Sequence, residues 1–437
     1  MEHCNKNRGV QLFLSFVLIS GVTFSFAGIS EVIAKEYFVS ASNGNDKNSG
    51  TQQEPYLSLT KGVSVLTPGD ILFIRGGIYK GSSSLSNIPN GNSWSNPVTI
   101  KAFQNEKVVI TAEPGETVLK FNATNQYIIL DGLILDGTGG VFGVSGGNTG
   151  TASHHIRIQN SEIKNAEWSG LIIGGTTHHY EFLNLHVHHN GSNNLDHGFY
   201  ITTANNLVSG CVIHDNSGRG ISLHSSGKQE GVDDNLVIRN KVFDNGTSSG
   251  SPGILVGYGL RNALVNNLVW GNQIGILVFA SASETKVYHN IVYGNSNQGI
   301  FLRRSNKASL VVNNIISMNG SVGLLIESGS GMSKITNNLI YSDSSGKLLA
   351  NNEPSAILSN NKIGTNYNPQ FFNPVDQDFH LKMGSPAINA GGVISEVEYD
   401  FDFLLRNQKK EYDMGAYLFL ESSQRPPTNL RVVGTSP

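Results

Sequence analysis

Two short segments of this sequence hold most of the residue types that acid–base chemistry needs. They contain, in order, an aspartate, a histidine, a tyrosine, an arginine, a serine and a second histidine: Asp196, His197, Tyr200, Arg219, Ser222 and His224. Imidazole and phenol groups can take up and return protons, and a guanidinium can neutralise a negative charge. The two segments therefore form a candidate catalytic cluster, provided that the fold brings them together.

A repeat predicts that the fold does so. Seven asparagines mark this repeat, at spacings of 23 to 29 residues: Asn165, Asn190, Asn216, Asn245, Asn272, Asn295 and Asn319. After each one comes a glycine followed by alternating apolar and variable residues, as in segments 198–201 and 220–223. This alternation has the two-residue period of a β-strand with one buried face. Asparagine suits the corners, because it tolerates left-handed backbone and its stacked amides can bond from coil to coil.

The length of the repeat predicts a solenoid, in which each unit buries its core against its neighbours. The repeat shows no helical spacing, and valine, isoleucine, glycine and asparagine dominate where a leucine-rich repeat would place leucine. The remaining fold class is an all-β parallel β-helix of about ten coils, spaced about 4.8 Å apart. This spacing predicts that His197 lies beside Arg219, with Tyr200 and His224 near them on the same face.

A second column of the repeat is rich in rings. Its members precede the corner asparagines: His188, His214, Phe243, Trp270 and Tyr293. If these rings point outward, they form a ladder on which sugar rings could stack, and together with Asp196 they are the predicted substrate-binding residues. The alternative is that the rings only cover and stiffen one side of the solenoid.

Two sets of residues could hold a metal ion. Ten of the thirteen histidines lie between His154 and His224. Among them, the segment 186–189 places alternate histidines on one face, although no carboxylate or cysteine partner appears at a matched spacing. Three aspartates could supply hard oxygen ligands to a calcium ion: Asp215, Asp233 and Asp234. The alternative for these aspartates is an ordinary solvated loop.

The ends of the chain differ from the repeat. Lys6 and Arg8 precede an apolar stretch over residues 10–27, which predicts a secretory signal; the alternative is a membrane anchor. The expected organisation is a signal peptide at 1–34, a cap with the first strands at 35–97, the β-helix at 98–350, a closing segment at 351–422 and a linker or tail at 423–437. With 14% charged residues and a net charge of −3, neither nucleic acid nor an acidic membrane surface is suggested as a partner.

Both ends also carry motifs that resemble those of a known group of proteins. Near the start these motifs are Tyr37-Phe-Val-Ser40, a turn-rich loop at 43–50, helical spacing over 57–66, Pro68-Gly69-Asp70 and Gly77-Ile-Tyr79. Near the end they are Asn368-Pro-Gln-Phe371, Gly384-Ser-Pro-Ala-Ile-Asn389-Ala-Gly391 and Asp413-Met-Gly-Ala-Tyr417. Together with the repeat, they make the chain similar to secreted bacterial right-handed parallel β-helix proteins of the pectate-lyase-like superfamily.

The resemblance implies a secreted, monomeric protein that acts on a polysaccharide and makes no membrane contact after signal cleavage. It implies first a lyase that acts by β-elimination on a uronate-containing glycan, with His197 or Tyr200 as the base. Arg219 or a calcium ion would neutralise the uronate carboxylate, and His224 would protonate the leaving oxygen. The alternatives are a uronan C5-epimerase and a non-catalytic carbohydrate-binding or surface-adhesion β-helix. No motif decides among them. The Asp-rich calcium strands of classical pectate lyases are not found at repeat spacing, and no Asp-Pro-His-type epimerase motif is present. The paired aspartates that hydrolases of this fold use are also missing.

Overall fold

The computed structural model describes residues 34–421, apart from nine internal residues or short segments: 82–84, 86, 123, 148–151, 226–230, 247–249, 305–306, 343–346 and 407–410. The predicted signal peptide, except for its last residue, and the predicted tail lie outside the described residues. Within the described part of the chain, no helix is both long and apolar enough to cross a membrane.

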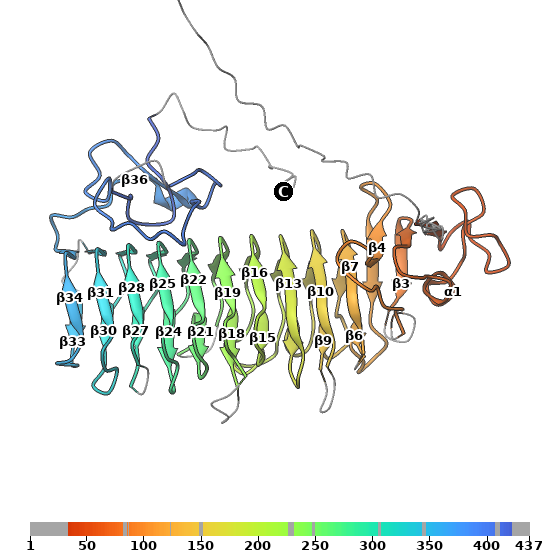
Figure 1. The fold of residues 1–437 in the computed structure, drawn as a ribbon, viewed down its shortest axis with the longest axis horizontal. Helices are drawn as coiled ribbons and strands as arrows, with labels where there is room; N and C mark the ends of the chain where they lie inside the picture. The colour runs from red at the N-terminus through yellow and green to blue at the C-terminus, as the bar shows by residue number, and fades with distance from the viewer. Residues whose placement is uncertain are drawn as a thin grey trace, which may run out of the picture. The chain divides into compact units, whose positions relative to one another are not determined.

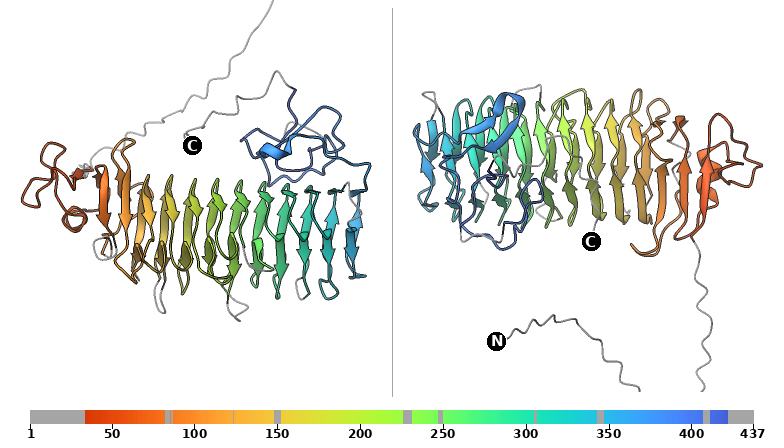
Figure 2. Two further views of the ribbon diagram at one scale, coloured as in Figure 1. Left: turned by 180° about the vertical axis from the view of Figure 1, so that it is seen from behind. Right: turned by 90° about the horizontal axis from the view of Figure 1, so that it is seen from above.

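Three parallel sheets form the body of the molecule, and each coil contributes one strand to each sheet in turn (Figures 1 and 2). The first sheet has 13 strands: β1 (Glu36–Val39), β2 (Ile71–Ile74), β4 (Val98–Ala102), β7 (Gln126–Asp131), β10 (His154–Gln159), β13 (His178–Leu183), β16 (Leu207–Ser209), β19 (Leu236–Ile238), β22 (Ala263–Val265), β25 (Lys286–Tyr288), β28 (Leu310–Val312), β31 (Lys334–Thr336) and β34 (Ile357–Ser359).

The second sheet has 12 strands: β3 (Gly77–Lys80), β5 (Val108–Thr111), β8 (Ile134–Asp136), β11 (Glu162–Lys164), β14 (His186–His188), β17 (Val212–His214), β20 (Lys241–Phe243), β23 (Leu268–Trp270), β26 (Ile291–Tyr293), β29 (Ile315–Ser317), β32 (Leu339–Tyr341) and β35 (Lys362–Ile363). The third sheet has 10 strands: β6 (Leu119–Phe121), β9 (Val144–Gly146), β12 (Leu171–Ile173), β15 (Phe199–Ile201), β18 (Ile221–His224), β21 (Pro252–Gly257), β24 (Ile274–Phe279), β27 (Gln298–Leu302), β30 (Val322–Ile326) and β33 (Lys347–Asn351).

The register between coils follows the alternation in the sequence. In the third sheet, Phe199 pairs with Ile221 and both side chains are fully buried. Tyr200, the next residue after Phe199 on β15, points to the outer face. The same pattern repeats along the sheets, so inward apolar residues make one continuous core. The predicted parallel β-helix is confirmed, and its ten-stranded third sheet matches the expected number of coils.

Buried asparagines connect successive coils. The side-chain amide of Asn216 donates to the side-chain oxygen of Asn245 at 2.9 Å, and Asn190 donates to Asn216 in the same way at 3.0 Å. The coil-to-coil bonds expected from the repeat are therefore present. The expected left-handed backbone occurs at Asn165, but in the other six coils it falls on the residue before the marker asparagine, such as His189 before Asn190.

Asn165 is also one residue out of register with the ladder. Lys164 pairs with His188, so Ala166 takes the place that Asn190 occupies in the next coil. The backbone N–H of Ala166 donates to the side-chain oxygen of Asn190 at 3.1 Å, and Asn165 itself is exposed with a left-handed backbone.

The N-terminal region joins the β-helix directly. Helix α1 (Leu59–Ser64) confirms the helical spacing predicted over 57–66, and Ser58 caps it by accepting from the backbone N–H of Lys61 at 3.1 Å. Strands β1 and β2 extend the first sheet in parallel register beyond β4. This region therefore continues the solenoid and also carries the helix at its first coils.

The C-terminal segment covers a side of the β-helix rather than its open end. Strands β34 and β35 continue the coils to Ile363, past the expected boundary at residue 350. The chain then returns over the later coils, where it forms the antiparallel pair β36 (Phe371–Asn373) and β37 (Asp378–Leu381), joined by the 3-10 turn η1 (Pro374–Asp376) (Figure 1). Its apolar side chains pack on outward residues of the second sheet.

Candidate functional site

The predicted acid–base residues meet on the outer face of the third sheet. Tyr200 on β15 pairs with Ser222 on β18, and His224 follows two residues later on the same face as Ser222. His197 and Arg219 precede these strands and lie side by side, with 2.8 Å between Nε2 of the imidazole and Nη1 of the guanidinium. The proximity that the repeat predicted is confirmed.

His197 is buried and accepts a hydrogen bond from Arg219. It is only 2% exposed, and Ser169 from the preceding coil accepts a hydrogen bond from its backbone N–H at 2.9 Å. A guanidinium only donates, so Nε2 of His197 accepts from Nη1 of Arg219, and the backbone N–H of Arg219 approaches Nδ1 at 3.2 Å. Burial and then the charge of Arg219 lower the pKa of His197 to about 3. The imidazole is therefore neutral, and its lone pair is directed at the guanidinium rather than outward.

Arg219 has donors to spare. Its Nε is buried without a hydrogen-bond partner, and none of the described carboxylates forms an ion pair with it. Burial lowers the pKa of Arg219, but a guanidinium remains protonated in proteins. Burying a cation without a counter-ion costs free energy, so the site attracts an anion. The planar donors of a guanidinium match a carboxylate.

Tyr200 and His224 are half-buried, and neither forms a hydrogen bond with the described residues. Burial raises the pKa of Tyr200, and the nearby Arg219 offsets only part of that effect, so the phenol keeps its proton at neutral pH. Burial and Arg219 both lower the pKa of His224, so its imidazole is neutral at neutral pH. One outward group is thus ready to donate a proton and the other to accept one.

Neighbouring rings fix the position of His224. Its imidazole is parallel to the ring of Phe279 two coils further on, with 5.9 Å between centroids and 2° between planes. Gly257 lies between them on β21, where a Cβ would come within 2.7 Å of the imidazole and 3.1 Å of the phenyl ring. The absence of a side chain at Gly257 therefore leaves room for both rings.

Asp196 does not face the cluster. Its Oδ2 accepts hydrogen bonds from the backbone N–H groups of Ser192 and Asn193, at 3.0 and 3.2 Å, and from the side chains of both residues. Asp196 is also only 8% exposed. The predicted substrate-binding role of Asp196 is corrected accordingly, because its carboxylate orders the loop between β14 and β15.

The predicted ladder of rings exists on the outer face of the second sheet, and its later members are covered. His188, His214, Phe243 and Trp270 stack in order, with 5.2, 4.7 and 4.4 Å between successive centroids. Trp270 is 8% exposed, because Phe379 of the C-terminal segment packs on it. Trp270 therefore covers one side of the solenoid, as the alternative interpretation predicted. Phe379 occupies the face on which a sugar ring would stack.

Tyr293 is also in contact with the C-terminal segment. Its ring lies 5.2 Å from that of Phe379 and 6.0 Å from that of Phe371. A cavity of about 440 Å³ remains beside it, lined among others by Tyr341 and Lys382. Tyr293 therefore contacts the C-terminal segment and lines this cavity together with Phe371.

The aspartates predicted to share a calcium ion do not come together. Asp215 lies at the end of β17, where its Oδ2 is 2.6 Å from Nδ1 of His214. Asp234 lies before β19 and forms a salt bridge with Arg261 at 2.6 Å, and Asp233 accepts from the backbone N–H of Leu260 at 2.7 Å. These carboxylates belong to two different corners of the coil and already have partners, which corrects the prediction.

Ser169 is a residue of the site that sequence reasoning missed. It directly precedes the strand glycine of its coil. His197 and Arg219 hold the same position in the next two coils. That shared column is the signal that could have selected it.

The architecture matches a known family over most of the chain. A family model described as Pel9A-like, right handed beta helix region, matches residues 37–326, and a general right-handed β-helix model matches residues 283–373. The chain belongs to the Pel9A-like right-handed β-helix family.

Individual relatives of this family member are distant. Pectate lyase L of Paenibacillus polymyxa is 26% identical over 204 residues, which span 45% of this chain and only 39% of the relative. The uncharacterized protein YwoF of Bacillus subtilis is 25% identical over 338 residues, spanning 65% of this chain and 69% of YwoF. Among solved structures, pectate lyase Pel9A superposes with a TM-score of 0.61 at 18% identity, covering 88% of this chain and 96% of Pel9A. That likeness establishes the fold alone.

Proposed function

We propose that the chain is a polysaccharide lyase that cleaves a uronate-containing glycan by β-elimination at the outer face of the third sheet. The observation that carries the proposal is Arg219, a half-buried guanidinium whose Nε has no partner and which has no carboxylate partner among the described residues. A uronate carboxylate would supply the missing anion. The distant relatives named pectate lyase support the same substrate class. A secreted location, expected from residues 1–34, belongs to the same proposal.

The reaction needs a group that stabilises negative charge, a base and an acid. Arg219 binds the uronate carboxylate and stabilises the negative charge that develops when the neighbouring C5 loses its proton. His224 takes that proton, and the C5 electron pair forms the C4–C5 double bond while the C4–oxygen bond breaks. Tyr200 gives its phenolic proton to the departing oxygen, and solvent returns a proton from His224 to Tyr200.

The protonation states reverse the two roles that the resemblance implied, in which Tyr200 was a possible base and His224 the proton donor. A neutral His224 can accept a proton, whereas a protonated Tyr200 can donate one. Tyr200 and Ser222 face each other across about 4.8 Å, and His224 lies about 7 Å further along β18, so the acid and the base stand on neighbouring strands of one sheet. His197 remains in the site as a positioning residue for Arg219.

The pH profile should carry the signature of His224. The value of kcat/KM should rise with pH along a limb whose midpoint lies below about 6.5, because the base must be neutral and burial lowers its pKa. Steady-state rates on a soluble uronan across the acidic range would measure this limb. Replacement His224→Gln should remove it, whereas His178→Gln on the first sheet should leave it in place. A limb that survives in His224→Gln would contradict the assignment of the base.

The positioning role of His197 can be separated from catalysis. His197→Gln keeps an acceptor for Nη1 of Arg219, whereas His197→Leu removes it. We expect kcat/KM to fall by about 10- to 100-fold in His197→Leu and to be largely restored in His197→Gln, because misplacing the carboxylate receiver by about 1 Å has an effect of that size. The acidic limb should persist in both variants. Its disappearance in His197→Gln would instead make His197 the base.

A substrate screen tests the proposal as a whole. The full chain would be incubated with pectate, alginate and hyaluronan, and three products would be followed: the absorbance of unsaturated uronate, new reducing ends and the ratio of uronate epimers. A lyase gives the first two together. Reducing ends without unsaturated uronate would indicate hydrolysis, a changed epimer ratio alone would indicate a C5-epimerase, and retention on a glycan column without any product would indicate a binding protein. Each of these three results would overturn the proposal.

A further inference from the structure

We propose that Glu162, His186 and His188 bind one divalent metal ion of the zinc class on the outer face of the second sheet. The position is distinct from the third-sheet site, and the ion would connect two neighbouring coils. Imidazole nitrogen and carboxylate oxygen are the donors that zinc accepts in proteins, while calcium requires a shell made of oxygen.

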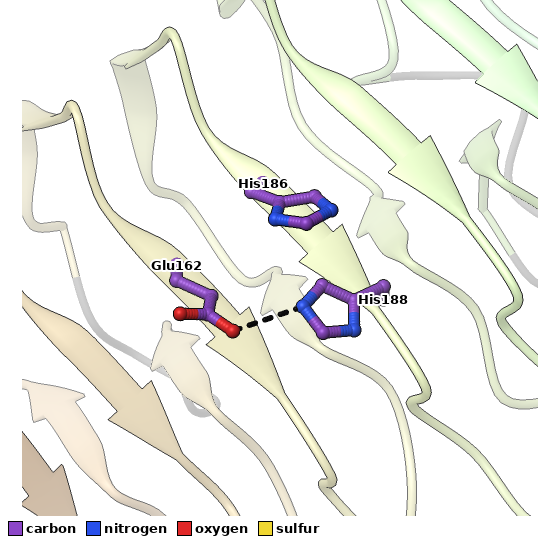
Figure 3. A group of neighbouring side chains, drawn as sticks. All are labelled: Glu162, His186 and His188. Carbon is purple, nitrogen blue, oxygen red and sulfur yellow. Dashed lines mark hydrogen bonds and ion pairs between the residues drawn. The ribbon is translucent and has the colours of Figure 1, made fainter.

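The backbone register brings the three side chains together. Glu162 on β11 pairs directly with His186 on β14, and His188 follows two residues later, so all three project from the same face (Figure 3). One ligand atom from each lies within 4.8 Å of the others, and Nε2 of His188 is 3.0 Å from Oε1 of Glu162. Ligands of a tetrahedral zinc ion are about 3.3 Å apart, so closure needs only small side-chain rotations. His186 is the exposed member of the three.

The other ring nitrogens already have partners that would orient both ligands. Nε2 of His186 lies 2.7 Å from Nε2 of His214, whose Nδ1 is 2.6 Å from Oδ2 of Asp215. This chain directs protons from His186 towards His214 and from His214 towards the carboxylate, which leaves the lone pair on Nδ1 of His186 for the metal. Nδ1 of His188 is 2.7 Å from Nδ1 of His189 in the same way. Hydrogen bonds of this kind fix the tautomer and orientation of metal-binding histidines.

The charges also suit a cation. Nδ1 of His186 offers a lone pair, and Nε2 of His188, which donates to Oε1 of Glu162 at 3.0 Å, would release its proton when it binds the metal. The Glu162 carboxylate accepts hydrogen bonds from Lys164 and His188, which is the role of an ionised carboxylate. Lys164 contacts Oε1 at 2.7 Å, and no described residue hydrogen-bonds to Oε2, the second oxygen. Neutral imidazoles and an ionised carboxylate are the forms that metals bind.

Titration of the full chain tests the site. After treatment with a chelator and its removal, Zn²⁺ would be added in a calorimeter, and Co²⁺ would report coordination geometry by its visible absorption. We expect one Zn²⁺ per chain, the strong visible bands of tetrahedral Co²⁺, and a raised melting temperature in the presence of Zn²⁺, since the metal binds only the folded chain. Glu162→Gln and His188→Gln should each weaken Zn²⁺ binding at least about 10-fold, because each removes a ligand.

A matched histidine pair gives the control. His178 and His179 are adjacent histidines on β13 of the same coil, with 2.6 Å between their Nδ1 atoms, but they lie on the first sheet without a carboxylate in their group. The double variant His178→Gln/His179→Gln should bind Zn²⁺ like the wild type. Binding that is lost there, or that is unchanged in both Glu162→Gln and His188→Gln, would overturn the site, as would wild-type chain that takes up no Zn²⁺. Circular dichroism would show that each variant is folded.

Discussion

Replacing Arg219 with lysine should reduce kcat/KM on a uronate polymer by about 10²- to 10³-fold, the usual loss when one group that stabilises developing charge is removed. Lysine keeps the positive charge, but its single ammonium cannot contact both His197 and a carboxylate with the geometry of a guanidinium. Initial rates of unsaturated uronate formation would measure the effect. Arg219→Gln, which also removes the charge, should lose at least as much.

Arg261→Lys provides the matched control for this prediction. Arg261 is paired with Asp234 at an exposed corner away from the third sheet, so the same substitution there should leave kcat/KM within about twofold of wild type. Equal effects at the two positions would show that the loss at Arg219 reflects stability. An Arg219→Lys variant with full activity would contradict the assigned role.

Replacing Asn290 with alanine should lower the free energy of unfolding by about 3 to 5 kcal/mol, because several buried polar groups lose their partners at once. The Asn290 side chain is fully buried and donates to the backbone oxygens of Leu264 and Tyr288 and to the side chain of Asn314. Its oxygen accepts from the backbone and side chain of Asn267. Chemical unfolding followed by circular dichroism would measure the change.

Asn297→Ala is the matched comparison, since the side chain is exposed and accepts only from Ser321 among the described residues. We expect that change to cost less than about 1 kcal/mol. If the two alanine variants unfolded at the same denaturant concentration, buried asparagines that bond from coil to coil could not be a main source of stability.

The fold could be predicted because its signal is repeated in every coil. The alternation around Phe199 and Ile221 gave the strands, and the regular spacing gave the register that places Tyr200 opposite Ser222. The position of the C-terminal segment could not be predicted, since Phe379 meets Trp270 through a contact between residues more than a hundred positions apart. No local sequence pattern indicates which side of a solenoid such a segment covers.

The site was predicted in part for the same reason. Adjacent coils placed His197 beside Arg219, but burial decided that His197 supports the arginine, and burial cannot be read from residue types. Asp196 failed as a substrate-binding residue because its carboxylate serves its own loop. Glu162 was missed because it belongs to the coil before His186 and His188, 24 residues earlier than His186.

The most direct test compares a uronan carrying free carboxylates with the same polymer after methyl esterification, using wild type and Arg219→Gln side by side. If Arg219 receives the carboxylate, wild-type kcat/KM should be at least about 10²-fold higher on the free acid, and Arg219→Gln should lose most of that preference. A wild-type chain that cleaves both polymers equally, or a preference that persists unchanged in Arg219→Gln, would contradict the account.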